Sequence, residues 1–154
     1  MEKKVVFFGC SMRGGYGVVS QEDLAKLPDV IEKLGYKLAS RHQTQVGIVA
    51  KENEQTPPYI HDRDYCWLKG ADVGVFEISN PSLGAGAEIA DMIHEGKPVL
   101  CLFKGDEKAV SAYIRGMQGS EFVKTSFECH AYVTLDDAKT IIDRFMSDNI
   151  AYLR

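Results

Sequence analysis

The sequence of 154 residues has little that would point to a membrane or a nucleic acid. No apolar run approaches the roughly 20 residues that a membrane-spanning helix needs. The formal net charge of -4 argues against a nucleic-acid groove or an anionic membrane surface as the main partner. The N-terminal Met-Glu-Lys-Lys leads directly into a strand-like run, without a signal-peptide pattern. We therefore expect a cytoplasmic protein with no membrane and no nucleic-acid partner.

Cysteine is also sparse, and its positions argue against a disulfide framework. Cys10, Cys66, Cys101 and Cys129 are far apart and form no C-x-x-C pair. Cys10 and Cys101 lie in strand-like runs, where a thiol packs as a small apolar group. This pattern favours a reducing cytosol over disulfides or a zinc site. Because the four histidines show no metal spacing either, we expect neither a metal nor a cofactor.

Apolar strands alternate with helical patterns along the chain. Strand-like runs occur at 4–8, 36–39, 73–78 and 99–103, with a weaker one within 122–133. Helical spacing of apolar residues separates them. This alternation predicts a single domain over 1–154 with an α/β fold. The expected architecture is a doubly wound, mostly parallel five-stranded sheet of the flavodoxin or Rossmann type.

Local signals set the expected helix boundaries. Ser20 is typical of the capping residue at a helix start. Thr56 and Pro57 suit the N-cap and the first position of a further helix. Pro28 interrupts the helical pattern of 20–34, which predicts either two short helices or one kinked helix. The polar segment 41–55 is expected to be mostly loop or short helix, and long loops of this kind often form functional rims.

The stretch 71–91 organises the chain as strand, small-residue loop and helix. Its helix is expected to carry Glu88 in the first turn, where the helix dipole favours an anion. The residue would then lie at the carboxyl end of a buried strand, where open α/β sheets place their ligands. A carboxylate held ionised in a site is one interpretation of Glu88. A helix N-terminal acid that only supports the helix is the other.

A second carboxyl group lies within an apolar helical stripe. Ile60, Asp64, Trp67 and Leu68 follow i, i+4, i+7, i+8 spacing. An acid on such a face is costly unless it is paired or functional. Asp64 therefore either reaches a neighbouring arginine or backbone donor, or points into a pocket with a raised pKa.

The first strand leads into a loop suited to phosphate. Gly9-Cys10-Ser11-Met12-Arg13-Gly14-Gly15 combines backbone N–H groups with one guanidinium. Its spacing is neither G-x-G-x-x-G nor a Walker loop. A plain connecting loop is the alternative. Further along, the apolar spacing over 110–117 predicts an amphipathic helix, with Ser111 just off the buried stripe.

Four segments in one order resemble the nucleoside 2-deoxyribosyltransferase superfamily, and within it the 2′-deoxynucleoside 5′-monophosphate N-glycosidases. These segments are 9–15, 60–68, 80–88 and 111–116. The resemblance implies hydrolysis of the N-glycosidic bond of a deoxynucleotide through a deoxyribosyl-enzyme ester. By this resemblance, Glu88 is the nucleophile, and Asp64 protonates the leaving base and then activates water.

The resemblance also implies a substrate-binding set: Ser11, Met12, Arg13, Gly14, Ser82, Gly84 and Ser111. Ser11, Arg13, Ser82 and Gly84 would hold the 5′-phosphate, and Met12 would pack on the base. Ser111 would come from the second subunit of a homodimer.

One position departs from the family pattern. A first-strand tyrosine that hydrogen-bonds the nucleophile is replaced here by Phe7, and Tyr16 or Tyr65 is a candidate substitute. Three alternatives stay open. They are a deoxyribosyltransferase that exchanges bases, a phosphoribohydrolase of the cytokinin-activating type, and a non-catalytic nucleotide sensor. A phosphoribohydrolase of this type carries a Gly-Gly-x-Gly-Thr run, and the segment 82–86 departs from that pattern.

Overall fold

A five-stranded parallel sheet forms the centre of the computed structural model, which describes residues 2–150. Its strands follow the order β2-β1-β3-β4-β5, and every neighbouring pair is parallel. The strands are β1 (Val5–Cys10), β2 (Lys37–Leu38), β3 (Val73–Glu77), β4 (Val99–Phe103) and β5 (Phe127–Ala131). This is the flavodoxin-type order, so the predicted doubly wound fold is confirmed and the sheet is entirely parallel.

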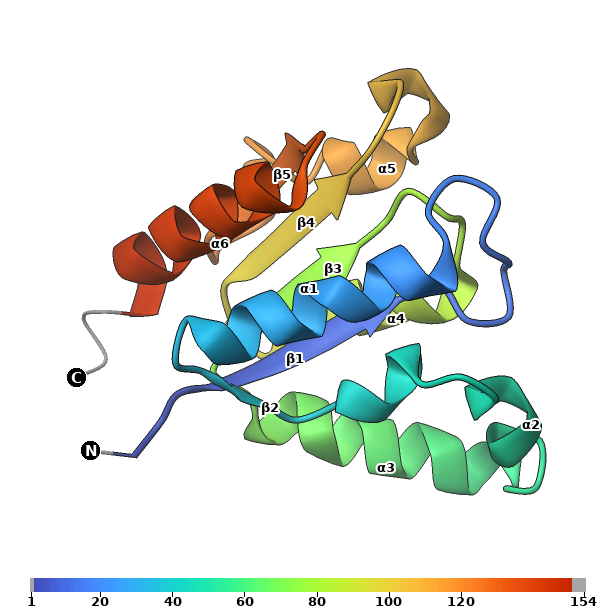
Figure 1. Ribbon diagram of the computed structural model, residues 1–154. Coiled ribbons are helices and arrows are strands. Elements are labelled where there is room, and N and C mark those ends of the chain that lie inside the picture. The colour runs from blue at the N-terminus through green and yellow to red at the C-terminus, as the bar shows by residue number, and fades with distance from the viewer. Residues whose placement is uncertain (1, 151–154) are drawn as a thin grey trace.

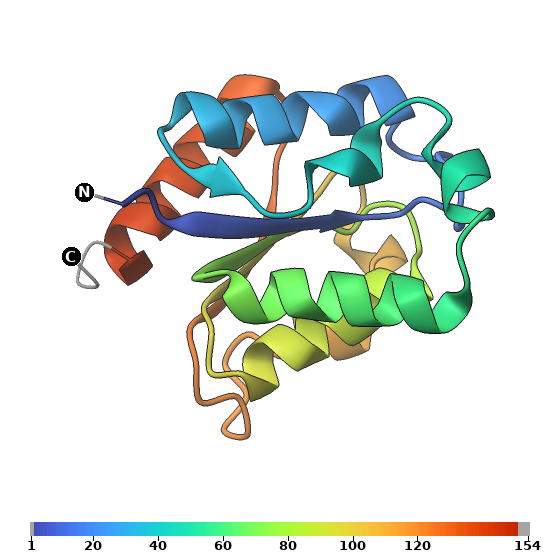
Figure 2. The same ribbon diagram turned by 90° about the horizontal axis from the view of Figure 1, so that it is seen from below.

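Helices cover both faces of the sheet (Figures 1 and 2). Their bounds are α1 (Gln21–Lys33), α2 (Ile48–Glu52), α3 (Pro57–Gly70), α4 (Leu83–His94), α5 (Ala112–Arg115) and α6 (Leu135–Ile150). Two 3₁₀ turns, η1 (Arg41–Thr44) and η2 (Glu107–Ala109), complete the elements. Figure 2 shows α1 and α6 on one side of the strands and α3 and α4 on the other.

Each face of the sheet buries its own apolar cluster. Val6, Phe8 and Val75 point toward α1 and α6, whereas Phe7 and Phe76 point toward α3 and α4. Alternate residues of a strand face opposite sides, so β1 and β3 supply both clusters. The two helical layers are thereby held independently against the same strands.

The predicted helix starts are confirmed by their caps. The Ser20 hydroxyl accepts a hydrogen bond from the Asp23 N–H, and the Thr56 hydroxyl accepts one from the Tyr59 N–H. Pro57 occupies the first position of α3. Pro28 lies inside α1, which is one continuous helix. The segment 41–55 forms the short elements η1 and α2, as expected.

Two sequence expectations about helices are wrong. Helix α4 begins at Leu83, which puts Glu88 in the second turn, where backbone N–H groups already bond within the helix. The predicted helix over 110–117 is the single turn α5, and Tyr113 is 82% exposed rather than buried in a stripe. Glycine at 116 and exposed polar neighbours leave that segment too little apolar surface to extend the helix.

Candidate active site

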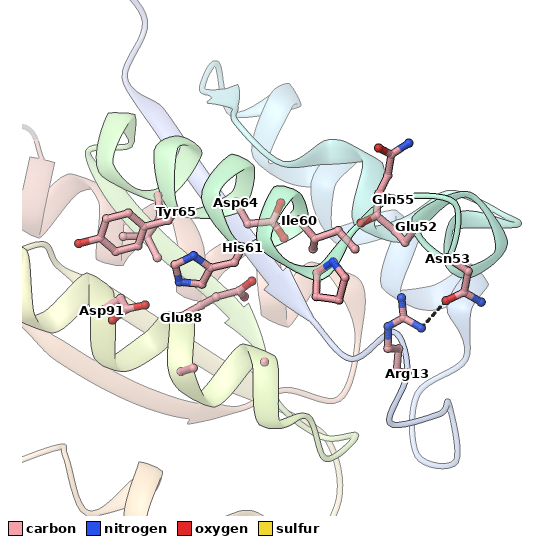
Figure 3. A pocket seen from close by; sticks show the side chains of 14 residues that line it. Arg13, Glu52, Asn53, Gln55, Ile60, His61, Asp64, Tyr65, Glu88 and Asp91 are labelled. Carbon is pink, nitrogen blue, oxygen red and sulfur yellow. Dashed lines mark hydrogen bonds between the residues drawn. The ribbon is translucent and has the colours of Figure 1, made fainter.

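A cavity of about 620 Å³ opens between α3 and α4 and is also lined by Arg13 from the loop after β1. Parallel α/β sheets bind ligands at this point, where the strand order reverses. Figure 3 shows side chains from both helices around one space. The lining residues are Arg13, Glu52, Asn53, Gln55, Pro57, Ile60, His61, Asp64, Tyr65, Leu68, Gly84, Ala87, Glu88 and Asp91.

Glu88 reaches this cavity from the second turn of α4. A Cβ atom on Gly9 would lie 3.1 Å from Glu88 Oε2, so the glycine leaves room for the carboxyl group above β1. Within residues 2–150, no donor hydrogen-bonds to that carboxyl group. Burial, followed by the nearby charges of Asp64 and Asp91, raises the pKa of Glu88 to about 8.

The expectation that Glu88 is held ionised is therefore wrong for the unliganded protein. Helix α4 starts too early for its free N–H groups to reach the side chain. A carboxyl group without hydrogen-bond donors in a desolvated position keeps its proton to higher pH.

Asp64 faces the same cavity from α3. Its Oδ1 accepts a hydrogen bond at 2.9 Å from Nε of its sequence neighbour Arg63, and the Arg63 Nη2 forms an ion pair with the same oxygen at 2.8 Å. Burial raises the pKa of Asp64, and the Arg63 guanidinium opposes that rise. Both interpretations of Asp64 thus apply together, because the side chain is paired with an arginine and also lines a pocket.

The loop after β1 packs against the loop before α4. Ser11 is buried, and its hydroxyl lies within hydrogen-bonding distance of the Gly15 and Pro81 carbonyl oxygens. A Cβ atom on Gly14 would lie 1.9 Å from the Pro81 oxygen, so only glycine fits this approach. These contacts bring two segments of the expected phosphate set together across 70 residues of sequence.

Arg13 and Gly84 are the members of the expected phosphate set that line the cavity. Arg13 donates a hydrogen bond to Asn53 Oδ1 at 2.6 Å (Figure 3). Ser82 is the N-cap of α4, and its hydroxyl accepts from the Ala85 N–H. The first N–H groups of a helix have no intrahelical acceptor, so Gly84 lies where an anion is favoured.

The other expected binding residues lie outside the cavity lining. Met12 is partly buried in the loop after β1 and lies off the cavity, like Ser11, Gly14 and Ser82. Ser111 is exposed as the N-cap of α5, with its hydroxyl 3.4 Å from the Ile114 N–H. Its predicted role across a dimer stays a prediction.

Neither candidate, Tyr16 nor Tyr65, replaces the hydroxyl missing at Phe7. Phe7 is fully buried, with its ring centre 5.9 Å from that of Phe76. Tyr65 lines the cavity, but its hydroxyl donates to Glu95 Oε1 at 3.2 Å. Tyr16 packs against the cluster under α1 and α6, on the opposite face of the sheet. Across 2–150, neither hydroxyl contacts Glu88.

Sequence reasoning missed four residues of this region: Glu52, Asn53, Arg63 and Asp91. Asp91 follows Glu88 by three positions, so helical spacing alone places both on one face of α4. Arg63 directly precedes Asp64, which was a usable signal for the pairing. Glu52 and Asn53 belong to the polar segment 41–55, which carried no periodic signal and is positioned only by the folded chain.

Known proteins are similar in sequence to this chain over most of their length. A Rattus norvegicus protein named 5-hydroxymethyl-dUMP N-hydrolase is 32% identical over 154 residues, covering 96% of this chain and 86% of that protein. A Thermofilum pendens protein, provisionally named 2′-deoxynucleoside 5′-phosphate N-hydrolase 1, is 32% identical over 146 residues, covering 94% of this chain and 96% of its own. This chain belongs to the 2′-deoxynucleoside 5′-phosphate N-hydrolase family. The resemblance drawn from the four sequence segments is thereby confirmed.

A solved structure shares the fold of this chain. The Clostridium botulinum CMP N-glycosidase BcmB superposes with a TM-score of 0.65, covering 92% of this chain and 99% of that one. Because the two sequences are 18% identical, this likeness establishes the fold alone. No protein-family model matches the sequence.

Three further observations concern the described residues. Among residues 2–150, no three His, Cys, Asp or Glu side chains are grouped so that they could hold a metal ion. No helix within that range has the length and apolar character to span a membrane. All four cysteines are free thiols, and Cys10 and Cys101 are buried as predicted.

Proposed function

We propose that this protein hydrolyses the N-glycosidic bond of 2′-deoxynucleoside 5′-monophosphates, releasing the free base and 2-deoxyribose 5-phosphate. The observation that carries the proposal is the pair of carboxyl groups, Asp64 and Glu88, on facing helices of one cavity. Glycosidic hydrolysis with a covalent intermediate needs one nucleophilic carboxylate and one proton-carrying acid. The names of the N-hydrolase relatives support the same reaction class.

In the first step, the Glu88 carboxylate attacks C1′ of the sugar. The C1′–N bond breaks, its electron pair stays on the base, and the Asp64 carboxyl proton moves to the base. A deoxyribosyl ester of Glu88 and an ionised Asp64 result. The developing positive charge on the sugar favours the ionised form of Glu88, so substrate offsets the raised pKa of this residue.

In the second step, Asp64 accepts a proton from water, and the oxygen of that water bonds to C1′. The C1′–O bond to Glu88 breaks, and its electron pair returns to the carboxylate. Asp64 therefore acts first as acid and then as base. One proton on the pair serves both steps, because Asp64 regains from water the proton that it gives to the base.

The phosphate-binding part of the proposal rests on Arg13 and on the N-terminus of α4 at Gly84. Both line the cavity that holds the two carboxyl groups. Ser11 and Ser82 flank these positions and hold the two loops in place. A 5′-phosphate at this end would place C1′ deeper in the cavity, toward Glu88.

The proposal includes a homodimer in the cytoplasm, with Ser111 completing the partner's site. Ser111 is exposed and does not line its own cavity, and the neighbouring Tyr113 exposes an aromatic ring. Free cysteines support a reducing compartment. Sedimentation at assay concentration tests the dimer, and a fully active monomer would refute it.

Phe7 favours a second candidate, a nucleotide-binding protein without catalysis. Phe7 leaves Glu88 without the hydroxyl partner that the resemblance implies. A base-exchanging transferase is the remaining alternative, because it uses the same covalent step. The hydrolase, the nucleotide-binding protein and the transferase differ in whether they turn the substrate over, in whether a 5′-phosphate improves the reaction, and in whether the sugar passes to an acceptor base.

The decisive experiment compares a deoxynucleoside with its 5′-monophosphate, on the wild type and on Arg13→Ala, with and without a free acceptor base. The hydrolase should prefer the monophosphate by at least about 10²-fold in kcat/KM, because hydrogen bonds to a charged group contribute about 1.5–3 kcal/mol each. Arg13→Ala should lower activity on the monophosphate alone. Preference for the nucleoside with base exchange would establish the transferase, and binding without turnover would establish the sensor. Ribonucleotides such as CMP complete the panel.

A further inference from the structure

The two oxygens of Asp64 have different surroundings. Oδ1 accepts a hydrogen bond from Nε of Arg63 at 2.9 Å and forms an ion pair with Nη2 of the same guanidinium at 2.8 Å. In the chain from 2 to 150, nothing donates a hydrogen bond to Oδ2. Residues adjacent in a helix do not normally face each other, so Arg63 must fold back along α3 to make this contact.

Arg63 is itself held from two other directions. Its Nη1 and Nη2 donate to Glu52 Oε1 and Oε2 at 2.9 and 2.8 Å, a two-pronged contact with α2. Its guanidinium carbon also lies 4.8 Å from the ring centre of Trp67. The exposed fractions of the Arg63 and Glu52 side chains are 16% and 6%, so solvent competes little with this arrangement.

Arg63 supplies the positive charge beside Asp64. Glu52 from α2 and His42 from η1 act electrostatically on Asp64, and Glu88 faces it from α4, with Asp91 beside Glu88. Burial, followed by Arg63, lowers the pKa of His42, which keeps that ring largely neutral near pH 7. The other groups are acids, and they leave Arg63 to stabilise an ionised Asp64.

We propose that Arg63, fixed by Glu52, is a positioning residue that ties down Oδ1 of Asp64 and leaves Oδ2 as the oxygen that gives and takes the proton. This inference rests on the proposed hydrolysis. In the first step the proton leaves Oδ2 for the base, and Arg63 stabilises the carboxylate that forms. In the second step Oδ2 takes a proton from water. A single orientation of Asp64 therefore serves both steps.

The test measures kcat/KM against pH for the wild type, Arg63→Gln and Arg63→Lys, using deoxynucleotides with a poor and a good leaving base. Arg63→Gln removes the charge, so the acid limb, which reports the first proton lost from the Asp64 and Glu88 pair, should move upward by about 1 pH unit, while the rate falls more than tenfold for the poor leaving base. Arg63→Lys keeps a charge without the fork, so the limb should stay in place while the rate falls. Both losses should shrink for the good leaving base, which needs no proton.

Two controls separate positioning from structure. Arg41→Gln removes an exposed arginine that likewise bridges two acids, Asp29 and Glu32, and it should leave both limbs and rates unchanged. The double variant Glu52→Gln/Arg63→Gln avoids an unpaired buried Glu52, so it keeps the test valid if Arg63→Gln fails to fold. Its limb should also move upward, by less than in Arg63→Gln, because loss of the Glu52 charge lowers the pKa of Asp64.

The outcomes also distinguish this inference from the proposed function. An unmoved acid limb in Arg63→Gln or in the double variant, with equal rate losses for both leaving bases, would overturn the positioning role. An Asp64→Asn enzyme that keeps the alkaline limb would instead remove Asp64 as the acid, and the proposed mechanism with it.

Discussion

Two glutamates near the carboxyl end of β3 show how the same side chain serves different purposes on the two faces of one sheet. Glu77, the last residue of β3, faces the α1 and α6 side. Its Oε1 accepts from the Ser79 N–H at 2.6 Å, and its Oε2 accepts from the Tyr132 hydroxyl at 3.2 Å. Glu88 lies on α4, on the opposite side of the sheet, and no group within residues 2–150 donates a hydrogen bond to its carboxyl group. Burial raises the pKa of both carboxyl groups.

The difference between them lies in what each carboxyl group is free to contact. Glu77 is 1% exposed and satisfied, so it fixes the turn after β3. Glu88 opens into a cavity, where its unused lone pairs are available to a substrate. A buried carboxyl group with complete hydrogen bonding indicates structure, and one left incomplete beside a cavity indicates chemistry.

The largest effect is expected for Glu88→Gln, because an amide cannot form the sugar ester. Turnover should fall by at least about 10³-fold with the far-UV circular dichroism unchanged. Glu77→Gln is the matched variant on the other face and should keep activity within a few-fold. An equal loss of turnover in the two variants would show that the two glutamates do not differ in role.

Asp64→Asn should lower turnover by about 10²-fold or more, the range for loss of a general acid. The loss should shrink for deoxynucleotides whose leaving base needs no proton. Steady-state rates on a good and a poor leaving base measure this. A loss of rate that does not depend on the leaving base would show that Asp64 is not the general acid. Glu88 would then be the one carboxyl group of the pair with a chemical role.

The two glutamates should also differ in how pH affects stability. The pKa of Glu88 is about 8 in the folded protein against 4.5 for a free side chain. Its favourable contribution is therefore complete below pH 4.5 and is lost as the pH rises through 8.

Glu88→Gln cannot ionise, so it should be more stable than the wild type at pH 9, on the order of 2–4 kcal/mol. The gain should vanish near pH 4. Urea unfolding at both pH values measures it. A wild type more stable than the variant at pH 9 would contradict the raised pKa.

The smallest effect on activity is expected for Tyr132→Phe. The variant removes the hydrogen bond to Glu77 Oε2 and should lower the free energy of unfolding by about 1–3 kcal/mol. Activity should stay within about twofold. Thermal melts and kinetics on the same preparation decide, and a large loss of turnover with an unchanged melting temperature would show that Glu77 belongs to the chemistry.

Much of the fold could be predicted because its signals are local. The apolar runs of β3 and β4 are buried at every position, and such runs are typical of central parallel strands. The capping residues Ser20 and Thr56 act within three residues of themselves. The exposure of Tyr113 and the shortness of α5 were not predicted. The spacing of four apolar residues does not show whether a neighbouring element covers them.

The sequence by itself determined the alternation of strands and helices along the chain, the two candidate carboxyl residues and the glycines that let two loops approach each other. The tertiary structure alone decided which carboxyl group holds a proton at rest. Glu88 has its pKa raised by burial and by Asp64, a residue from another helix. Burial also raises the pKa of Asp64, but Arg63, which is itself held by Glu52, opposes that rise. Desolvation and Coulomb interactions depend on distances between segments far apart in the chain, so spacing along the sequence does not contain them.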